Sequence, residues 1–141
     1  MATLAIVFVT AMAGGLVAGL NAGLDYNTWP LMDGEWVPDG ILALSPWWLN
    51  AFENIATVQF DHRMLAYATT PCIGWLWWRC LRTRAAIPAT AMAAMTLIQL
   101  GLGIATLLLV VPLPLAALHQ AAAAVLFGLA VWVAQSLSRT R

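Results

Sequence analysis

Lysine is absent from the 141 residues of this chain, and charged residues of all kinds make up only 9% of it. A soluble domain carries about 25% charged residues, so this chain has too few of them to cover a water-exposed surface. The formal net charge is zero, which argues against the basic surface typical of nucleic-acid-binding proteins. Apolar residues, at 62%, are abundant and predict a membrane protein.

Cysteine and histidine are also scarce, with two residues of each. Cys72 and Cys80 fall eight positions apart in one predicted helix, about 12 Å along its axis. This separation is too long for a disulfide bond. We therefore expect no intrachain bridge and treat both residues as small buried side chains.

Four apolar runs are each long enough to cross a bilayer as a helix, which takes about 20 residues. They predict an all-α integral membrane four-helix bundle that forms a single domain over residues 1–141. The predicted helices cover residues 2–23, 55–79, 86–110 and 113–136, and a loop of residues 24–54 joins the first two.

Charge is distributed unevenly along the chain. The six acidic residues lie between the first run and the start of the second: Asp25, Asp33, Glu35, Asp39, Glu53 and Asp61. Five of the six arginines lie elsewhere, in the turn between the second and third runs and in the tail: Arg79, Arg82, Arg84, Arg139 and Arg141. The positive-inside rule then predicts that both termini are inside and that loop 24–54 is outside.

The outer loop is rich in tryptophan and proline, and Trp and Tyr favour the membrane–water interface. We expect this loop to form a partly structured cap on the outer face. In the first helix, small residues recur every four positions, at Ala11, Gly15, Gly19 and Gly23. This pattern predicts close helix packing, or else room for a flat cofactor.

The two histidines, His62 and His119, each fall inside a predicted membrane helix, where a polar side chain is costly and usually functional. His62 lies about 10 Å into the second helix and His119 about 9 Å into the fourth. Both helices enter from the outer face, so the two imidazoles should lie at matching depth and can face one another across the bundle.

Two imidazoles without cysteine or carboxylate companions suit an axial pair on haem iron better than zinc, which prefers four ligands. Small residues at Ala66, Ala122 and Ala123 would border the macrocycle. The simpler alternative is two histidines that are hydrogen-bonded within a packed bundle.

Four neighbouring polar residues complete the candidate site. Gln59 lies one turn before His62 and is placed to hydrogen-bond there, while Arg63 lies where haem propionates would emerge or serves as an interfacial anchor. Asp61 should be solvated at the interface, and Gln99 should make a hydrogen bond between helices.

Several segments give the chain a resemblance to the haem A synthase family, also called the Cox15/CtaA family. The most specific run is Asn27-Thr28-Trp29-Pro30-Leu31-Met32, and Val58-Gln59-Phe60-Asp61-His62-Arg63 also resembles the family. So do the glycine-rich segment 14–23, the segment 99–108 that begins Gln99-Leu100-Gly101-Leu102-Gly103, and His119-Gln120. The resemblance extends over nearly the whole chain.

The resemblance implies an eight-helix protein of two similar four-helix halves, in the bacterial cell inner membrane or the mitochondrial inner membrane. The first half of such proteins usually carries Glu three residues before its His-Arg pair, and this chain has Gln59 there, so it resembles the C-terminal half. The resemblance implies that this half holds haem b, with His62 and His119 as its axial ligands.

The reaction implied is oxidation of a haem O ring methyl to a formyl group, which gives haem A for cytochrome oxidase. The substrate haem O would be held by an N-terminal half that this chain lacks, with a haem O synthase or an oligomer as a further partner. We therefore expect that this chain alone does not make haem A. The alternatives are a two-histidine cytochrome b that serves as an electron-transfer or membrane-anchor subunit, and a structural subunit without a cofactor.

Overall fold

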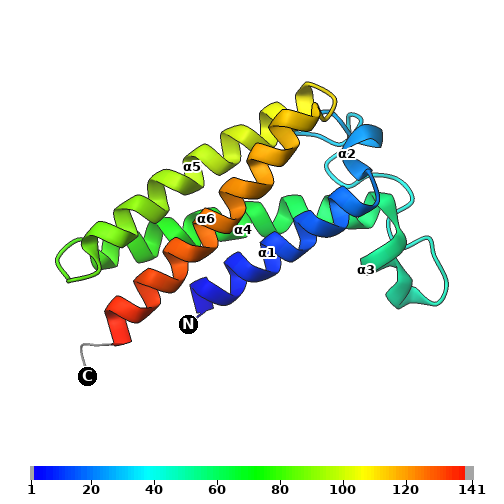
Figure 1. Cartoon of the computed structure of the whole chain (residues 1–141). Coiled ribbons are helices and arrows are strands. Elements are labelled where there is room, and N and C mark those ends of the chain that lie inside the picture. Colours follow the sequence, from blue (N-terminus) through cyan, green and yellow to red (C-terminus); the bar gives the residue numbers. More distant parts are fainter. Residues whose placement is uncertain (1, 139–141) are drawn as a thin grey trace.

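Four long helices dominate the computed structural model, which describes residues 2–138 (Figure 1). They are α1 (Ala2–Gly19), α4 (Ile55–Cys80), α5 (Ala86–Leu108) and α6 (Leu113–Ser138). Three short helices, α2 (Ala22–Asp25), η1 (Trp47–Leu49) and α3 (Asn50–Glu53), lie in the segment that joins α1 to α4. Within residues 2–138 the sole β-type pairing is an isolated bridge between Met32 and Glu35, so the predicted all-α fold is confirmed.

The long helices alternate in direction (Figure 1). The start of α1, the end of α6 and the turn 81–85 lie at one end of the bundle, the terminal end. Segment 20–54 and the turn 109–112 lie at the other, the loop end. Consequently α4 and α6 both run from the loop end towards the terminal end, which is the arrangement that equal histidine depths require.

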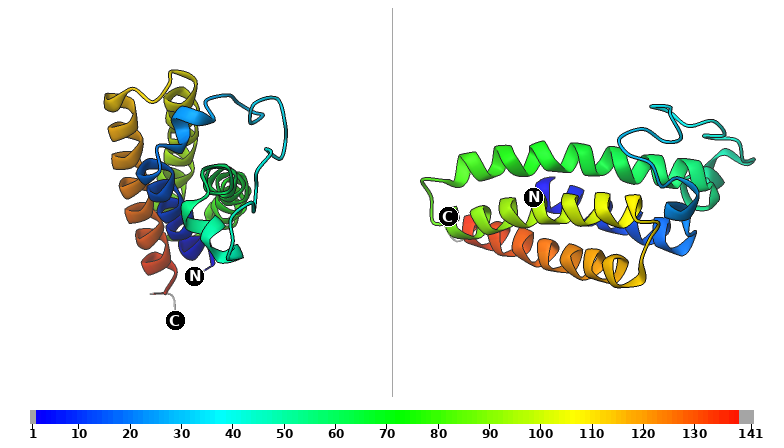
Figure 2. Two further views of the ribbon diagram at one scale, coloured as in Figure 1. Left: turned by 90° about the vertical axis from the view of Figure 1, so that its right-hand side faces the viewer. Right: turned by 90° about the horizontal axis from the view of Figure 1, so that it is seen from above.

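The packing order places α4 and α6 on a diagonal. α1 packs against α4 and α6, and α5 also packs against these two helices. In the end-on view of Figure 2, α6 and α4 accordingly lie on opposite sides of the bundle. Side chains from these two helices can therefore reach the core from opposite directions.

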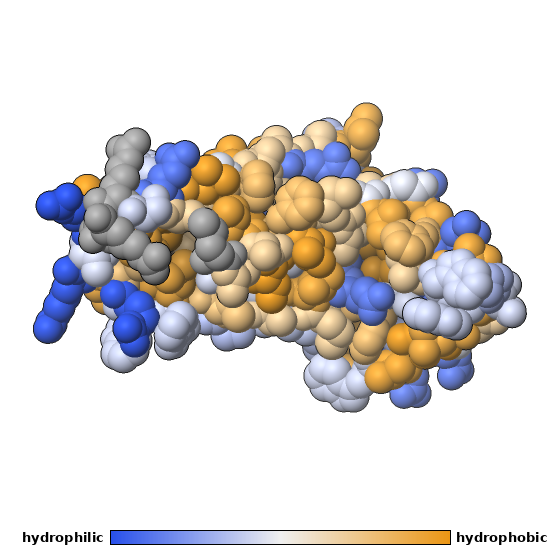
Figure 3. All heavy atoms as spheres, turned by 90° about the horizontal axis from the view of Figure 1, so that it is seen from below, coloured by the Kyte–Doolittle hydropathy of each residue, from blue (hydrophilic) through white to orange (hydrophobic). Residues whose placement is uncertain are grey.

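The surface of the bundle matches a membrane protein. Among residues 2–138, α1, α5 and α6 are long and apolar enough to cross a bilayer. On the face shown in Figure 3, hydrophobic residues dominate the middle of the long axis and hydrophilic residues gather towards the ends. α4 has 26 residues but is less apolar, because its first half carries Gln59, Asp61 and Arg63.

The helix ends differ from the predicted ones most at the first helix. α1 stops at Gly19 instead of residue 23, because Asn21 adopts a left-handed conformation with φ 54°, which interrupts the helix before α2. Asn and Gly are among the residues that best tolerate this conformation. The other long helices begin as predicted, and their last residues fall within two positions of the predicted ones. Arg139 and Arg141, which the topology prediction also used, lie outside the described residues.

The two halves of the bundle have different interiors. The apolar core occupies the half towards the terminal end, and its buried residues are Val7, Ile73, Cys80, Ala85, Ala89, Met92, Leu126, Ala130 and Val133. The half towards the loop end contains both histidines. The bundle therefore has a close-packed apolar half at the terminal end and a half with polar side chains, including both histidines, at the loop end.

The loop between α1 and α4 is folded back onto the first turns of α4. Asn50, which is fully buried, bonds to the backbone of Leu44 and Trp47, and Asn54 donates to the Gly40 carbonyl. Asn54 also caps α4 by accepting a hydrogen bond from the backbone N–H of Thr57. The loop is thus tied to the bundle, in keeping with the predicted structured cap.

Candidate functional site

The structure brings His62 and His119 together across the core. His62 projects from the loop-end half of α4 and His119 from the loop-end half of α6, and both are half-buried. They are close enough for their charges to interact. Two residues 57 positions apart in the sequence thus come near one another, as their equal depths predicted.

Each imidazole rests on a glycine of a neighbouring helix. A Cβ atom added to Gly14 in α1 would lie 3.0 Å from Cε1 of His62, and one added to Gly103 in α5 would lie 2.9 Å from Cε1 of His119. One turn before each glycine, the backbone of Thr10 or of Gln99 also contacts the ring. The two sides of the site therefore use the same arrangement, in which a glycine leaves room for one ring.

The small-residue face of the first helix was predicted to pack closely or to leave room for a cofactor, and two of its glycines do neither within the bundle. Nothing lies within 4 Å of where a Cβ of Gly15 or Gly19 would be, so these glycines face away from the bundle. A Cβ added to Gly23 would lie 3.0 Å from Cγ2 of Val111, and the glycine beside a histidine of the site is Gly14. Gly14 lies one residue from Gly15, a rotation of about 100° around the helix axis, which turns it towards His62.

Buried polar atoms without a hydrogen-bond partner gather in the loop-end half. Among the described residues these atoms are Gln59 Oε1, His62 Nδ1, Arg63 Nε, Gln99 Oε1, Thr106 Oγ1 and His119 Nδ1. An unsatisfied buried polar group costs about 1–3 kcal/mol, so a packed interior rarely carries several. Three of these atoms, His62 Nδ1, His119 Nδ1 and Gln99 Oε1, belong to the two histidines and to the glutamine that bonds to the His119 carbonyl, which indicates a site that is completed by a polar or metal-bearing ligand.

Gln59 and Arg63 point to the loop. Both side chains donate to the Tyr26 carbonyl, Gln59 from Nε2 and Arg63 from Nη2, and Arg63 Nη1 reaches the carbonyls of Pro30 and Leu31. Gln59 is 3% exposed and Arg63 7%, so neither is a solvated interfacial anchor. Both residues were predicted to lie beside the histidines, and in the structure their side chains hydrogen-bond to the loop backbone.

Gln99 makes the interhelical bond that the sequence predicted. Its Nε2 atom donates to the backbone carbonyl of His119 at 3.0 Å and so joins α5 to α6 at the level of the site. Ala122, one turn after His119, is buried, and Ala66, one turn after His62, is half-buried. Small side chains therefore lie one turn after both histidines, where the sequence predicted the border of a macrocycle.

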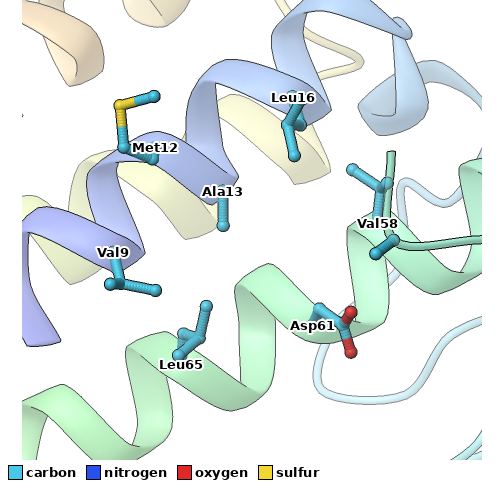
Figure 4. Close-up of a pocket in the computed structure, with 8 residues that line it drawn as sticks. Val9, Met12, Ala13, Leu16, Val58, Asp61 and Leu65 are labelled. Atoms are coloured by element: carbon cyan, nitrogen blue, oxygen red, sulfur yellow. The ribbon is translucent and has the colours of Figure 1, made fainter. Parts of the chain in front are cut away.

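Asp61 faces away from the histidine pair. Its side chain is exposed and lines a shallow groove of about 210 Å³ between α1 and α4. The other labelled residues around it are apolar, including Val9, Met12 and Leu65 (Figure 4). This position agrees with the prediction that Asp61 is not part of the histidine site.

The donor set fits a planar metal complex held from two sides. Within residues 2–138 no three His, Cys, Asp or Glu side chains gather into a cluster that could hold a metal ion, so the imidazole pair stands without a third ligand. Two imidazoles on diagonal helices match the axial ligation of a haem iron, and the Nδ1 atom of each ring is buried without a hydrogen-bond partner. The residues present therefore fit a haem.

Sequence reasoning missed Gly14, Gly103 and the Tyr26 carbonyl. The first two could have been found from a shared pattern, since each is the fourth residue after a polar one, Thr10 or Gln99. No sequence signal identifies which loop carbonyl receives a buried arginine, because any residue offers one.

A sequence profile described as cytochrome oxidase assembly protein, COX15-CtaA, matches residues 1–131. The haem A synthase of Parvibaculum lavamentivorans is 50% identical over 138 residues, which are 98% of this chain and 40% of that protein. The haem A synthase of Rhodospirillum centenum is 50% identical over 135 residues, covering 93% of this chain and 36% of that protein. Haem A synthase COX15 of Homo sapiens is 45% identical over 143 residues, covering 97% and 34%.

The chain therefore spans only 34–40% of the length of these relatives. No solved structure matches the chain.

Proposed function

We propose that this chain forms the haem-b-binding half of a haem A synthase. The premise is that the chain belongs to the COX15-CtaA family of cytochrome oxidase assembly proteins. The observation that carries the proposal is that His62 and His119, on the diagonal helices α4 and α6, lie near enough to interact electrostatically, with no third ligand among residues 2–138. When bound there, a bis-histidine haem b would supply one-electron transfer to the oxidation of a second porphyrin.

The protein's own residues would hold and orient that haem. His62 and His119 would ligate the iron from α4 and α6, with Gly14 and Gly103 leaving room for their rings. Gln99 would fix the register of α6 through the His119 carbonyl. Close helix packing in the terminal-end half would keep the two ligands at one depth.

The substrate would be held elsewhere. The chain has no histidine besides these two, so a second porphyrin, haem O, needs ligands from another polypeptide segment. The relatives are long enough to contain such a segment, since this chain covers 34–40% of them. We propose that such a segment binds haem O, delivered by a haem O synthase or within an oligomer. The ring methyl of the bound haem O would then be oxidised to a formyl group.

The test is expression in a host that makes haem O but has no haem A synthase, followed by chromatography of extracted haems. We expect no haem A from this chain alone. Haem A should appear when the chain is expressed with the remaining part of a relative such as that of Parvibaculum lavamentivorans. If the pair is assembled and loaded with haem b yet yields no haem A, an electron-transfer subunit becomes the better interpretation. Haem A from the isolated chain would contradict the separate substrate half.

We also propose that α4 crosses the membrane beside α1, α5 and α6, with both termini inside and the loop end outside. Arg79, Arg82 and Arg84 are exposed at the terminal end, and the loop carries acidic residues, which supports this orientation in a bacterial or mitochondrial inner membrane. Reporter fusions at Arg84 and at Asp39 should give activity on opposite sides. Activity on the same side for both fusions would show that α4 does not cross.

A further inference from the structure

We propose that Arg63 and Gln59 are positioning residues that hold the loop segment 26–32 closed over the loop end of the histidine site. The segment would then retain the cofactor, and Arg63 would act through the loop. The identity of the retained group rests on the proposed function, whereas the loop contacts do not.

Four hydrogen bonds join these two side chains to the loop backbone. Arg63 Nη2 donates to the Tyr26 carbonyl at 3.0 Å, and Nη1 donates to the carbonyls of Leu31 at 3.2 Å and Pro30 at 3.4 Å. Gln59 Nε2 donates to the Tyr26 carbonyl at 3.4 Å. One guanidinium therefore gathers both ends of a short loop segment.

The loop segment has a defined shape that presents these carbonyls. The Thr28 hydroxyl donates to the Leu31 carbonyl at 2.8 Å and accepts from the Asp33 N–H at 2.9 Å. Met32, which is buried, exchanges backbone hydrogen bonds with Glu35. The acceptors are thus held in place by the loop itself, and Arg63 binds a formed surface.

Arg63 holds the loop in place, and the loop in turn stabilises the buried charge of Arg63. Arg63 is 7% exposed. The loop stabilises its charge through the carbonyls that accept its hydrogen bonds and through the Asp33 carboxylate, which interacts with it electrostatically without forming an ion pair. A buried cation without such partners is strongly unfavourable. Opening of segment 26–32 would remove the hydrogen-bond acceptors of the buried Arg63 guanidinium. The free energy of the closed state is therefore lower.

The latch, by which we mean Gln59 and Arg63 together with the loop segment 26–32 that they bind, lies beside His62 in sequence. Gln59 and Arg63 are one helical turn apart on α4, so they share a face, and His62 is the residue directly before Arg63. A rotation of about 100° per residue turns His62 to the bundle while Arg63 faces the loop. Closure of the loop and the placement of His62 are consequently coupled through one turn of α4.

The experiment compares R63L, R63K and Q59L with R84L, which removes an exposed arginine at the opposite end of the bundle. Hydrogen exchange of the 26–33 amides is measured on the haem-free chain in detergent, and haem release to a scavenging apoprotein is measured on the haem-loaded chain. We expect R63L to speed both exchange and release by about tenfold, the scale for loss of an outer-shell group. The low-spin spectrum at saturating haem should persist. R63K and Q59L should give smaller increases, and R84L none.

Unchanged exchange in all three latch variants would overturn the proposal, even if release becomes faster, because Arg63 would then contact the cofactor directly. Faster exchange with unchanged release would also overturn it, because the loop would not retain the cofactor. If R63L does not fold, R63K and Q59L decide the question. If the native chain binds no haem, the proposed function fails, and the exchange data then test the latch by itself.

Discussion

Replacing either His62 or His119 with alanine should abolish low-spin haem binding by this protein. The two imidazoles lie together without a third metal-ligating group nearby among residues 2–138, so loss of one leaves a single axial ligand. Loss of a group that only orients a ligand costs about 10–100-fold in metal affinity, so loss of the ligand itself should exceed about 100-fold. Optical spectra and pyridine haemochrome analysis of purified protein measure the change.

The control for this experiment is D61N, which alters the residue before His62 in sequence but faces the groove between α1 and α4 (Figure 4). It should bind one haem b per chain with a low-spin spectrum, as the unaltered protein should. Retention of that spectrum in both histidine variants would contradict the assignment of the ligands. A colourless native protein, after expression with ample haem, would contradict the haem site as a whole.

Replacing Gly103 with alanine should weaken haem binding by about 10–100-fold, because the substitution displaces a metal ligand. The new methyl group would lie 2.9 Å from Cε1 of His119, so the ring or the helix has to move. Gly14→Ala should have the same kind of effect on His62, and a smaller one, since its contact is 3.0 Å. Haem titration of each variant gives the affinity, and the low-spin band shows how the ligands are arranged.

The matched controls are Gly101→Ala in α5 and Gly15→Ala in α1, where nothing lies within 4 Å of the added carbon. All four changes replace a helical glycine, and each should gain up to about 1 kcal/mol of helix stability from alanine's higher propensity. A binding defect confined to Gly103→Ala and Gly14→Ala therefore reports on the histidine rings and not on folding. Equal haem affinity in all four variants would show that the glycines do not position the ligands.

Much of the fold follows from the sequence, because bilayer thickness and hydropathy act on whole segments. The three apolar helices and the starts of all the later long helices were predictable from run length. The break after Gly19 was not, since it depends on Asn21 adopting a left-handed conformation that its side chain permits and does not require. The depth of each histidine was also predictable, because helical rise converts position in a run into distance.

The tertiary structure alone decided which side chains each histidine meets and what Arg63 does. Depth does not specify rotation, so the sequence singled out Gly15 and Gly19 in α1, while packing on α4 turned Gly14 towards His62. Arg63 was predicted to lie near haem propionates or at the interface, and its hydrogen-bond partners are carbonyls 32 to 37 positions earlier in the chain. Every residue carries a carbonyl, so only the path of the loop selects the ones that bind this arginine. The sequence by itself therefore determined the membrane helices and the paired histidines, and packing decided the surroundings that would make them a site.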